Sequence, residues 1–134
     1  MNFTKTTSYS LSILNYMAKN PDVRVSAEFL HSALNIPYQY LRQVLSALSR
    51  GGFILGTKGR NGGFLLNRQP DQIFLADIVY HSEGEDILKR CVMNFTVCPF
   101  NNVCPLHDLW KASRENMIDV LERTSLSDLI KISS

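Results

Sequence analysis

A mainly helical α+β fold is predicted for this chain of 134 residues, because apolar side chains follow a helical spacing over most of it. Four segments carry this spacing: residues 5–19, 27–33, 37–50 and 105–123. Two short apolar runs, residues 53–55 and 64–66, flank a glycine-rich segment and predict a single β-hairpin. The length suits one domain with a proper hydrophobic core.

Start and stop signals support the first three helices. Asn20–Pro21 ends the first helix, and Ser26 is a favourable N-cap residue for the second. Pro37 suits the first turn of the third helix, which Gly51–Gly52 terminates. Two short helices joined by a turn of three or four residues predict a helix-turn-helix.

The predicted hairpin carries a basic, glycine-rich tip. Strands are expected at Phe53–Leu55 and Phe64–Leu66, and Lys58–Gly63 connects them. Lys58 and Arg60 give this connection a positive charge. Helix, turn, helix and then a basic hairpin is the order of a winged helix. The predicted fold is therefore a winged helix-turn-helix with a two-stranded wing.

The second half of the chain is expected to hold a short helix, an irregular segment and a long helix. The short helix covers Ile73–Tyr80, and the irregular segment, Ser82–Val103, contains the cysteines. The longest helix follows over residues 105–123, and a last short helix covers residues 126–132. Within one compact chain we expect three parts: residues 1–80, the winged helix-turn-helix; residues 81–104, the cysteine-bearing loop; and residues 105–134, the long helix and the last helix.

Positive charge is concentrated in the helix-turn-helix and the hairpin. Residues 29–70 contain five basic and no acidic side chains, a net charge of +5. The residues after them contain six basic and ten acidic side chains, a net charge of −4. Such segregation suggests a face that meets a polyanion, with a chance distribution as the alternative. Together with the fold, it predicts binding of duplex DNA.

Contact with the DNA bases is expected at the start of the third helix, because the second helix of a helix-turn-helix enters the major groove there. Gln39, Arg42 and Gln43 can make bidentate contacts with base edges. Tyr38 and Tyr40 can reach phosphates or thymine methyl groups. A core position for Tyr40 is an equally weighted alternative.

The hairpin tip is the second expected contact with DNA. Lys58 and Arg60 would reach backbone phosphate or a minor groove, and the glycines would let the backbone approach the duplex closely. A plain hairpin turn is the structural alternative for this segment, and a solvated helix position is the alternative for Arg42. The combination of helix pair, turn, basic hairpin and acid-free segment favours DNA binding.

Three cysteines and a histidine form a second cluster of interest: Cys91, Cys98, Cys104 and His107. Three thiolates and an imidazole are a sufficient ligand set for one iron–sulfur cluster or one zinc ion. Structural zinc sites usually have cysteines two to four residues apart, and neither cysteine gap here is that short, so the spacing favours a cluster. Buried apolar cysteines, an exposed helix histidine and a disulfide are the alternatives.

Several of these segments together resemble one known family. They are Thr4–Lys5, the Tyr40–Leu45 run of the third helix, Gly59–Phe64 of the hairpin, the cysteine loop and Leu126–Ile130. Over nearly the whole chain they resemble the Rrf-two family, the bacterial iron–sulfur cluster regulators and nitric-oxide-sensing repressors of the IscR, NsrR and RirA types. The resemblance implies a transcriptional repressor that senses nitric oxide, redox state or iron–sulfur status.

The resemblance also implies a homodimer in which the helix of residues 105–123 packs against its copy in the partner. The interface residues that it implies are Leu106, Leu109, Trp110, Met117, Val120 and Leu121. Operators would be near-palindromic, with half-sites spaced to match the two-fold axis of the protein. A change of cluster state would then act by favouring one dimer arrangement over another.

The resemblance further implies a cluster ligated by Cys91, Cys98 and Cys104. In histidine-ligated members a 2Fe–2S cluster takes its fourth ligand from a position similar to His107. Nitric-oxide-sensing members can instead complete a 4Fe–4S cluster with an N-terminal aspartate, where this chain has Ser8. A 2Fe–2S cluster is therefore favoured over a 4Fe–4S cluster.

Two other classes of function compete with a cluster-sensing repressor. The first is a winged-helix regulator without a cluster, controlled by a protein partner or a small ligand. The second is an enzyme with a reactive cysteine, which we do not favour because the chain has no Cys-x-x-Cys motif. No apolar stretch approaches the roughly 18 residues of a membrane span, and the N-terminus lacks the features of a signal peptide. A cytoplasmic protein that binds no membrane is expected.

Overall fold

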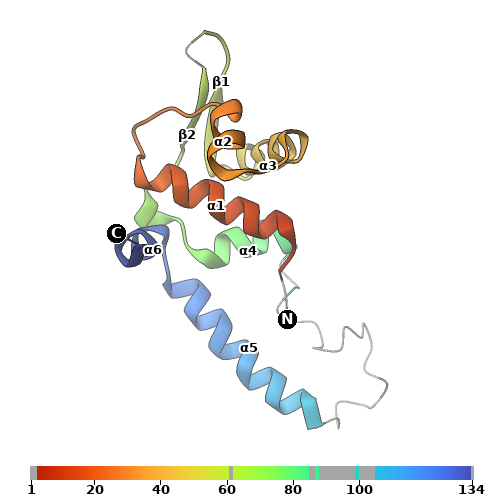
Figure 1. Ribbon diagram of the computed structural model, residues 1–134. Helices are drawn as coiled ribbons and strands as arrows, with labels where there is room; N and C mark the ends of the chain where they lie inside the picture. The colour runs from red at the N-terminus through yellow and green to blue at the C-terminus, as the bar shows by residue number, and fades with distance from the viewer. Residues whose placement is uncertain (1–2, 61, 85–86, 88–98, 100–104, 134) are drawn as a thin grey trace.

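The order of helices and strands is that of a winged helix followed by a long helix, as predicted (Figure 1). The computed structural model describes residues 3–60, 62–84, 87, 99 and 105–133. Its elements are α1 (Lys5–Lys19), α2 (Ala27–Leu34), α3 (Tyr38–Arg50), β1 (Ile54–Thr57), β2 (Gly63–Leu66), the 3-10 helix η1 (Pro70–Gln72), α4 (Leu75–Glu83), α5 (Pro105–Arg123) and α6 (Leu126–Ser133). The 3-10 turn at η1 was not predicted, and α4 begins and ends slightly later than expected.

The main hydrophobic core lies around α1, which contacts α2, α3, α4, α6 and β2. Its largest fully buried side chains come from α1, α2, α3, β1, α4 and the segments between them: Ile13, Leu14, Met17, Leu30, Ile36, Leu41, Leu45, Leu48, Ile54, Ile73 and Ile78. The C-terminal α6 returns to this core, where Leu126 is fully buried and Leu129 packs beside it. The last helix therefore stabilises the same half of the molecule that holds the helix-turn-helix.

Local contacts fix the turn between α2 and α3. The Ser26 hydroxyl accepts a hydrogen bond from the Phe29 backbone N–H at 3.1 Å and caps α2. Asn35 ends the helix in a left-handed conformation (φ 53°), which asparagine tolerates better than most residues. His31 Nδ1 donates to the Ile36 carbonyl oxygen at 2.6 Å across the turn. These contacts set the position of α3 relative to α2.

The wing is an antiparallel pair in which Ile54 faces Leu66 and Thr57 faces Gly63. Strand β2 also pairs with Val25 in the loop before α2, through two backbone hydrogen bonds of Phe64 with Val25 at 3.0 and 2.7 Å. Gly63 has φ +150°, and a Cβ there would lie 2.7 Å from the Val25 carbonyl oxygen. Only glycine permits this close approach, which anchors the wing to the helices.

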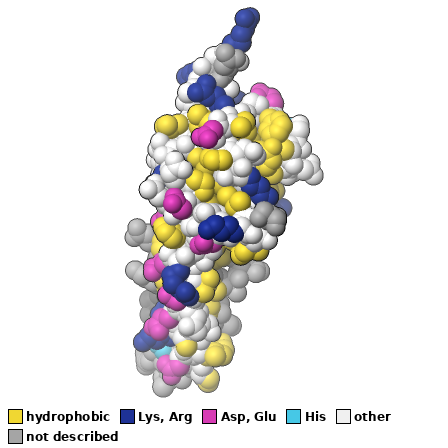
Figure 2. Space-filling view, turned by 90° about the vertical axis from the view of Figure 1, so that its left-hand side faces the viewer, with side chains coloured by type: hydrophobic (Ala, Val, Ile, Leu, Met, Phe, Trp, Pro, Cys, Tyr) yellow, Lys and Arg dark blue, Asp and Glu magenta, His cyan; other side chains and the backbone are white. Residues whose placement is uncertain are grey.

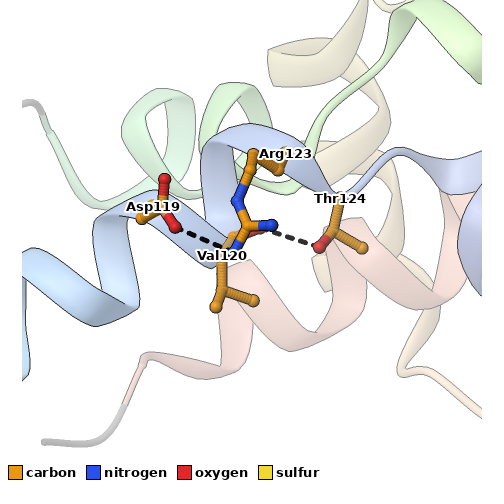
Figure 3. Close-up of polar contacts among 4 residues, drawn as sticks. All are labelled: Asp119, Val120, Arg123 and Thr124. Atoms are coloured by element: carbon orange, nitrogen blue, oxygen red, sulfur yellow. Dashed lines mark hydrogen bonds and ion pairs between the residues drawn. The ribbon is translucent and has the colours of Figure 1, made fainter.

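Helix α5 extends away from the rest of the molecule (Figure 1). Its C-terminal half packs against α4, with Met117, Ile118 and Leu121 in a small apolar cluster. At the end of α5, Arg123 pairs with Asp119 at 2.8 Å and the Thr124 hydroxyl donates to the Val120 carbonyl oxygen at 2.7 Å (Figure 3). None of the described helices combines the length and the apolar character that a membrane crossing requires.

Candidate nucleic-acid interface

Helix α3 presents a polar face to solvent and an apolar face to the core. Gln39, Arg42 and Gln43 are exposed. Its buried residues, Leu41, Val44, Leu45 and Leu48, recur every three or four positions and hold the helix against α1 and α2. The three side chains predicted to read DNA bases therefore lie together on the exposed face.

Tyr40 points toward the interior. Its ring packs edge-on against Tyr9 of α1, with 5.1 Å between ring centroids, and its hydroxyl lies 2.5 Å from the Thr6 hydroxyl. Tyr40 is half-buried in these contacts and packs against the main core. This is the core position that the sequence left open, and it joins α3 to α1.

A chain of polar contacts crosses from α2 to the exposed face of α3. The Tyr38 hydroxyl donates to Glu28 Oε1 at 3.1 Å and accepts from Arg42 Nη1 at 3.3 Å. The Arg42 guanidinium also lies 5.8 Å from the centre of the Tyr38 ring. The pKa of Glu28 is lowered, because its own backbone N–H and then the Tyr38 hydroxyl donate to the carboxylate, with a further contribution from the charge of Arg42.

Glu28 is the residue of this interface that the sequence did not indicate. It lies one position before the acid-free segment of residues 29–70 and was therefore counted outside it. Tyr38 and Arg42 are four residues apart on one helix, a spacing that places them side by side and could have suggested their contact. The approach of Glu28 depends on how α2 and α3 cross, which no local pattern specifies.

The wing tip extends beyond the helices and carries Lys58 and Arg60, both exposed. Figure 2 shows Lys and Arg side chains gathered at this end of the molecule. Gly59 has φ +106°, and its carbonyl oxygen accepts from the Gly62 N–H at 3.0 Å, so the tip turns tightly. The tip and the exposed face of α3 therefore both present cations or hydrogen-bond donors to solvent.

One of the five basic residues in the acid-free segment, Arg68, makes contacts inside the fold. Arg68 is half-buried, donates from Nη2 to the Gly51 carbonyl oxygen at 3.2 Å, and lies 4.7 Å above the centre of the Phe53 ring. These contacts hold the end of α3 against the start of the wing. Arg50, in the last turn of α3, is exposed and complements the helix dipole.

Helix α4 ties α1 and α3 together just before the cysteine segment. Glu83 Oε2 accepts from the Thr4 backbone N–H at 2.9 Å and from the Thr4 and Thr7 hydroxyls, each at 2.7 Å. His81 Nε2 donates to the Ala47 carbonyl oxygen at 2.8 Å. The sequence did not indicate these contacts, because their partners lie between 34 and 79 positions apart.

The predicted metal ligands are described only in part. Cys91, Cys98 and Cys104 lie outside the described residues, and His107 is exposed in the first turn of α5. Among the residues that the structure describes, no three His, Cys, Asp or Glu side chains come together as a metal site. The structure therefore does not test the ligand set.

The six residues predicted for a dimer interface fall into two groups on α5. Leu106, Leu109 and Val120 are exposed, with 41%, 66% and 51% of their surface accessible. Leu121 is buried against α4, Met117 is half-buried beside it, and Trp110 is half-buried. The apolar face of α5 is thus divided between α4 and solvent.

Known proteins are similar to this chain over nearly its whole length. The family model of Rrf2, described as an iron-dependent transcriptional regulator, matches residues 3–132. The HTH-type transcriptional regulator NsrR of Halalkalibacterium halodurans is 33% identical over 132 residues, which cover 97% of this chain and 90% of that protein.

Solved structures agree with this assignment. The structure of CymR (YrzC), the global cysteine regulator of B. subtilis, superposes with a TM-score of 0.83 at 26% identity, and covers 100% of this chain and 99% of that one. IscR of T. potens, at 20% identity, shares the fold with a TM-score of 0.77 and covers 100% of this chain and 89% of that one. This chain therefore belongs to the Rrf2 (Rrf-two) family and is a DNA-binding transcriptional regulator, not an enzyme.

Proposed function

We propose that this chain represses transcription as a homodimer, with α3 in the major groove of duplex DNA and the wing on the adjacent backbone or minor groove. The observation that carries the proposal is the exposed polar face of α3, with Gln39, Arg42 and Gln43, beside a wing that ends in Lys58 and Arg60. Arginine and glutamine side chains at such positions pair with guanine and adenine edges. Lysine and arginine at the tip neutralise phosphates.

The dimer contact that we propose is the exposed apolar part of α5. Leu109 and Leu106 lie on the half of the helix that extends beyond α4, and a leucine with 66% of its surface accessible is costly to leave in water. A second copy of the same helix would cover these side chains. Two α3 helices related by a two-fold axis would then meet a near-palindromic operator.

A 2Fe–2S cluster held by Cys91, Cys98, Cys104 and His107 is the sensor that we propose, with a 4Fe–4S cluster as the less favoured form. The donor chemistry fits, since three thiolates and an imidazole match the ligands of such clusters, and His107 is exposed at the start of α5. When bound, the cluster would supply iron that reacts with nitric oxide and changes with redox state and iron supply. The chain itself must provide two dimer arrangements that differ in affinity for the cluster states.

The first experiment measures iron and acid-labile sulfide per protomer, with a visible spectrum, on protein purified without oxygen. A stoichiometric coloured cluster supports the sensor, and the iron count separates 2Fe–2S from 4Fe–4S. Cys98→Ala should lose the iron and keep its helical circular dichroism, whereas Ser113→Ala on the exposed surface of α5 should keep both. Full iron in Cys98→Ala would contradict the ligand assignment.

A regulator without a cluster is the second candidate function. It is favoured by the close structural similarity to CymR, which is described as a global cysteine regulator. In that case a protein partner or a small ligand would control the same DNA-binding surface. Protein that is colourless as purified and also resists anaerobic reconstitution would support this function and leave the DNA-binding proposal standing.

A further inference from the structure

We infer that Glu28 is a positioning residue for sequence recognition, which holds Arg42 toward the bases through the hydroxyl of Tyr38. This inference rests on the proposed function, because it assumes that the exposed face of α3 reads DNA. It assigns a role to an acidic side chain at the edge of a surface that otherwise attracts phosphate. Such a carboxylate would be unfavourable there if it did no more than face the duplex.

The direction of each hydrogen bond in the chain is determined by chemistry. A carboxylate can only accept and a guanidinium can only donate, so the Tyr38 hydroxyl must donate to Glu28 and accept from Arg42. The observed distances, 3.1 Å and 3.3 Å, fit both bonds at once. Glu28 thereby orients the hydroxyl lone pair toward Arg42, which an unpaired tyrosine hydroxyl would not do.

Tyr38 is held from a second side, so it can serve as a fixed support. The His31 ring packs edge-on against the Tyr38 ring, with 5.7 Å between centroids and an angle of 83°. His31 is itself fixed by its hydrogen bond to the Ile36 carbonyl oxygen. Tyr38 is half-buried, whereas Arg42 is exposed and would otherwise sample many rotamers. The support therefore acts on the side chain with the most conformational freedom.

The carboxylate is stable at this place because of the helix that carries it. Glu28 lies in the first turn of α2, where free backbone N–H groups and the helix dipole favour a negative charge. Its own backbone N–H and Tyr38 lower its pKa, so the side chain remains ionised at the pH of any DNA-binding assay. The carboxylate is therefore charged and in contact with Tyr38 in the structure without DNA.

Two opposite effects follow from replacing Glu28 by alanine, which removes both the negative charge and the oxygen that accepts from the Tyr38 hydroxyl. Loss of a negative charge near phosphate should raise affinity for every duplex. Loss of the oriented hydroxyl should loosen Arg42 and lower the preference for the correct sequence. A residue that only repelled phosphate would show the first effect alone. The ratio of specific to non-specific affinity is therefore the readout that separates the two roles.

The experiment uses the full-length protein purified without oxygen and a duplex selected by the wild-type protein from a random-sequence library. Affinity is measured for this duplex and for a scrambled duplex of the same length and composition. We expect Arg42→Ala to reduce the affinity ratio by about tenfold or more, the size of one lost base contact. Glu28→Ala and Tyr38→Phe should each reduce it by about three- to tenfold. The matched control, Asp22→Asn, removes an exposed acid from the same half of the molecule and should leave the ratio unchanged.

Combining the substitutions decides the mechanism. In an Arg42→Ala background, Glu28→Ala should have no further effect on the ratio, because nothing remains for Glu28 to position. An equal loss in both backgrounds would mean that Glu28 contacts a base by itself, which would overturn the inference. An unchanged ratio in Glu28→Ala or Tyr38→Phe would also overturn it. If the wild-type protein selects no sequence at all, the proposed function fails instead.

Discussion

The two ends of the molecule differ in how completely one chain covers its own apolar surface. The recognition half, which consists of α1 to α4 and the wing, contains eleven large side chains that are less than 2% accessible, and Tyr40, Arg68 and His81 add contacts to α3 or its end. At the far end of α5, Leu106 and Leu109 remain 41% and 66% accessible. The recognition half therefore has its own hydrophobic core, although Val23, Phe29 and Leu55 are also exposed on its surface, whereas the exposed leucines of α5 are the ones that we propose a second copy covers.

This difference predicts two kinds of stability in one protein. Contacts inside the recognition half should contribute to folding at any protein concentration. Contacts of α5 with a second copy would contribute only as far as the dimer forms, so their effect should depend on concentration. Substitutions in the two regions can separate these contributions.

The largest expected effect is on the core of the recognition half. Leu48 is fully buried in α3, so Leu48→Ala should lower the free energy of unfolding by about 2 to 5 kcal/mol through lost burial and the cavity that it leaves. Urea denaturation at two protein concentrations measures this loss. We expect the same difference from wild type at both concentrations, and a loss below about 1 kcal/mol would mean that the core around α3 is less tightly packed than the structure indicates.

The next effect concerns association. Leu109→Glu places a charge on the exposed apolar part of α5 and should shift the proposed dimer toward monomers. Sedimentation velocity over a concentration series measures the shift. Val23→Glu is the matched control, because Val23 is similarly exposed, at 56%, but lies in the loop between α1 and α2. An unchanged dimer in Leu109→Glu would move the interface away from this part of α5.

The sequence predicted the helices and strands of the recognition half better than the polar contacts between them. Helix ends are determined by neighbouring residues, whereas these contacts join residues far apart in the chain. Ser26 and Asn35 act on their own helix ends, so their roles are visible in neighbouring residues. Glu83 and Thr4 are 79 positions apart, and only the packing of α4 on α1 brings them together. Arg68 was counted with the basic residues expected to face DNA, because no residue near it in the sequence indicates its contact with the Phe53 ring.

The sequence predicted that α5 is a helix with an apolar face, but not which of its apolar residues pack against α4 and which are exposed. Helical spacing alone placed Met117 and Leu121 on the same face as Leu109. The structure assigns Met117 and Leu121 to the contact with α4 and leaves Leu109 exposed. A periodic pattern marks which side of a helix is apolar, but it does not say which neighbour covers each turn.

A smaller effect, on the salt dependence of DNA binding, should distinguish the cation proposed to contact DNA, Lys58, from the cation that stabilises the fold, Arg68. Lys58→Ala should weaken binding to all sequences alike and reduce the slope of affinity against salt concentration by about one counterion. Arg68→Ala removes the same charge from the same segment but also the contacts with Gly51 and Phe53. It should lower the melting temperature while changing the salt slope less than Lys58→Ala. Equal slopes for the two variants would place Arg68 on the DNA as well.

The smallest expected effect is on the acid sensitivity of α6, the helix that returns to the core. Asp128 Oδ2 accepts from the Ser125 N–H at 3.0 Å, and the Ser125 hydroxyl accepts from the Asp128 N–H at 3.2 Å, so the two residues cap the helix reciprocally. The Ser125 backbone and side chain lower the pKa of Asp128 below its ordinary value of 3.8. Because the folded pKa is the lower one, this cap stabilises the protein above about pH 4 and is lost as the pH falls through the folded value.

Asp128→Ala tests how much this cap contributes to the free energy of unfolding at each pH. The variant should be less stable than the wild type near neutral pH, and the difference should shrink as the pH is lowered below 3.8, where the wild type also loses the ionised cap. Urea denaturation between pH 6 and pH 3 measures both curves. Glu28 has a lowered pKa too, but it lies at the surface of α2, so Glu28→Gln should reduce the acid dependence separately and additively. A difference between Asp128→Ala and wild type that stays constant over this range would show that the Asp128 side chain stabilises α6 without its charge.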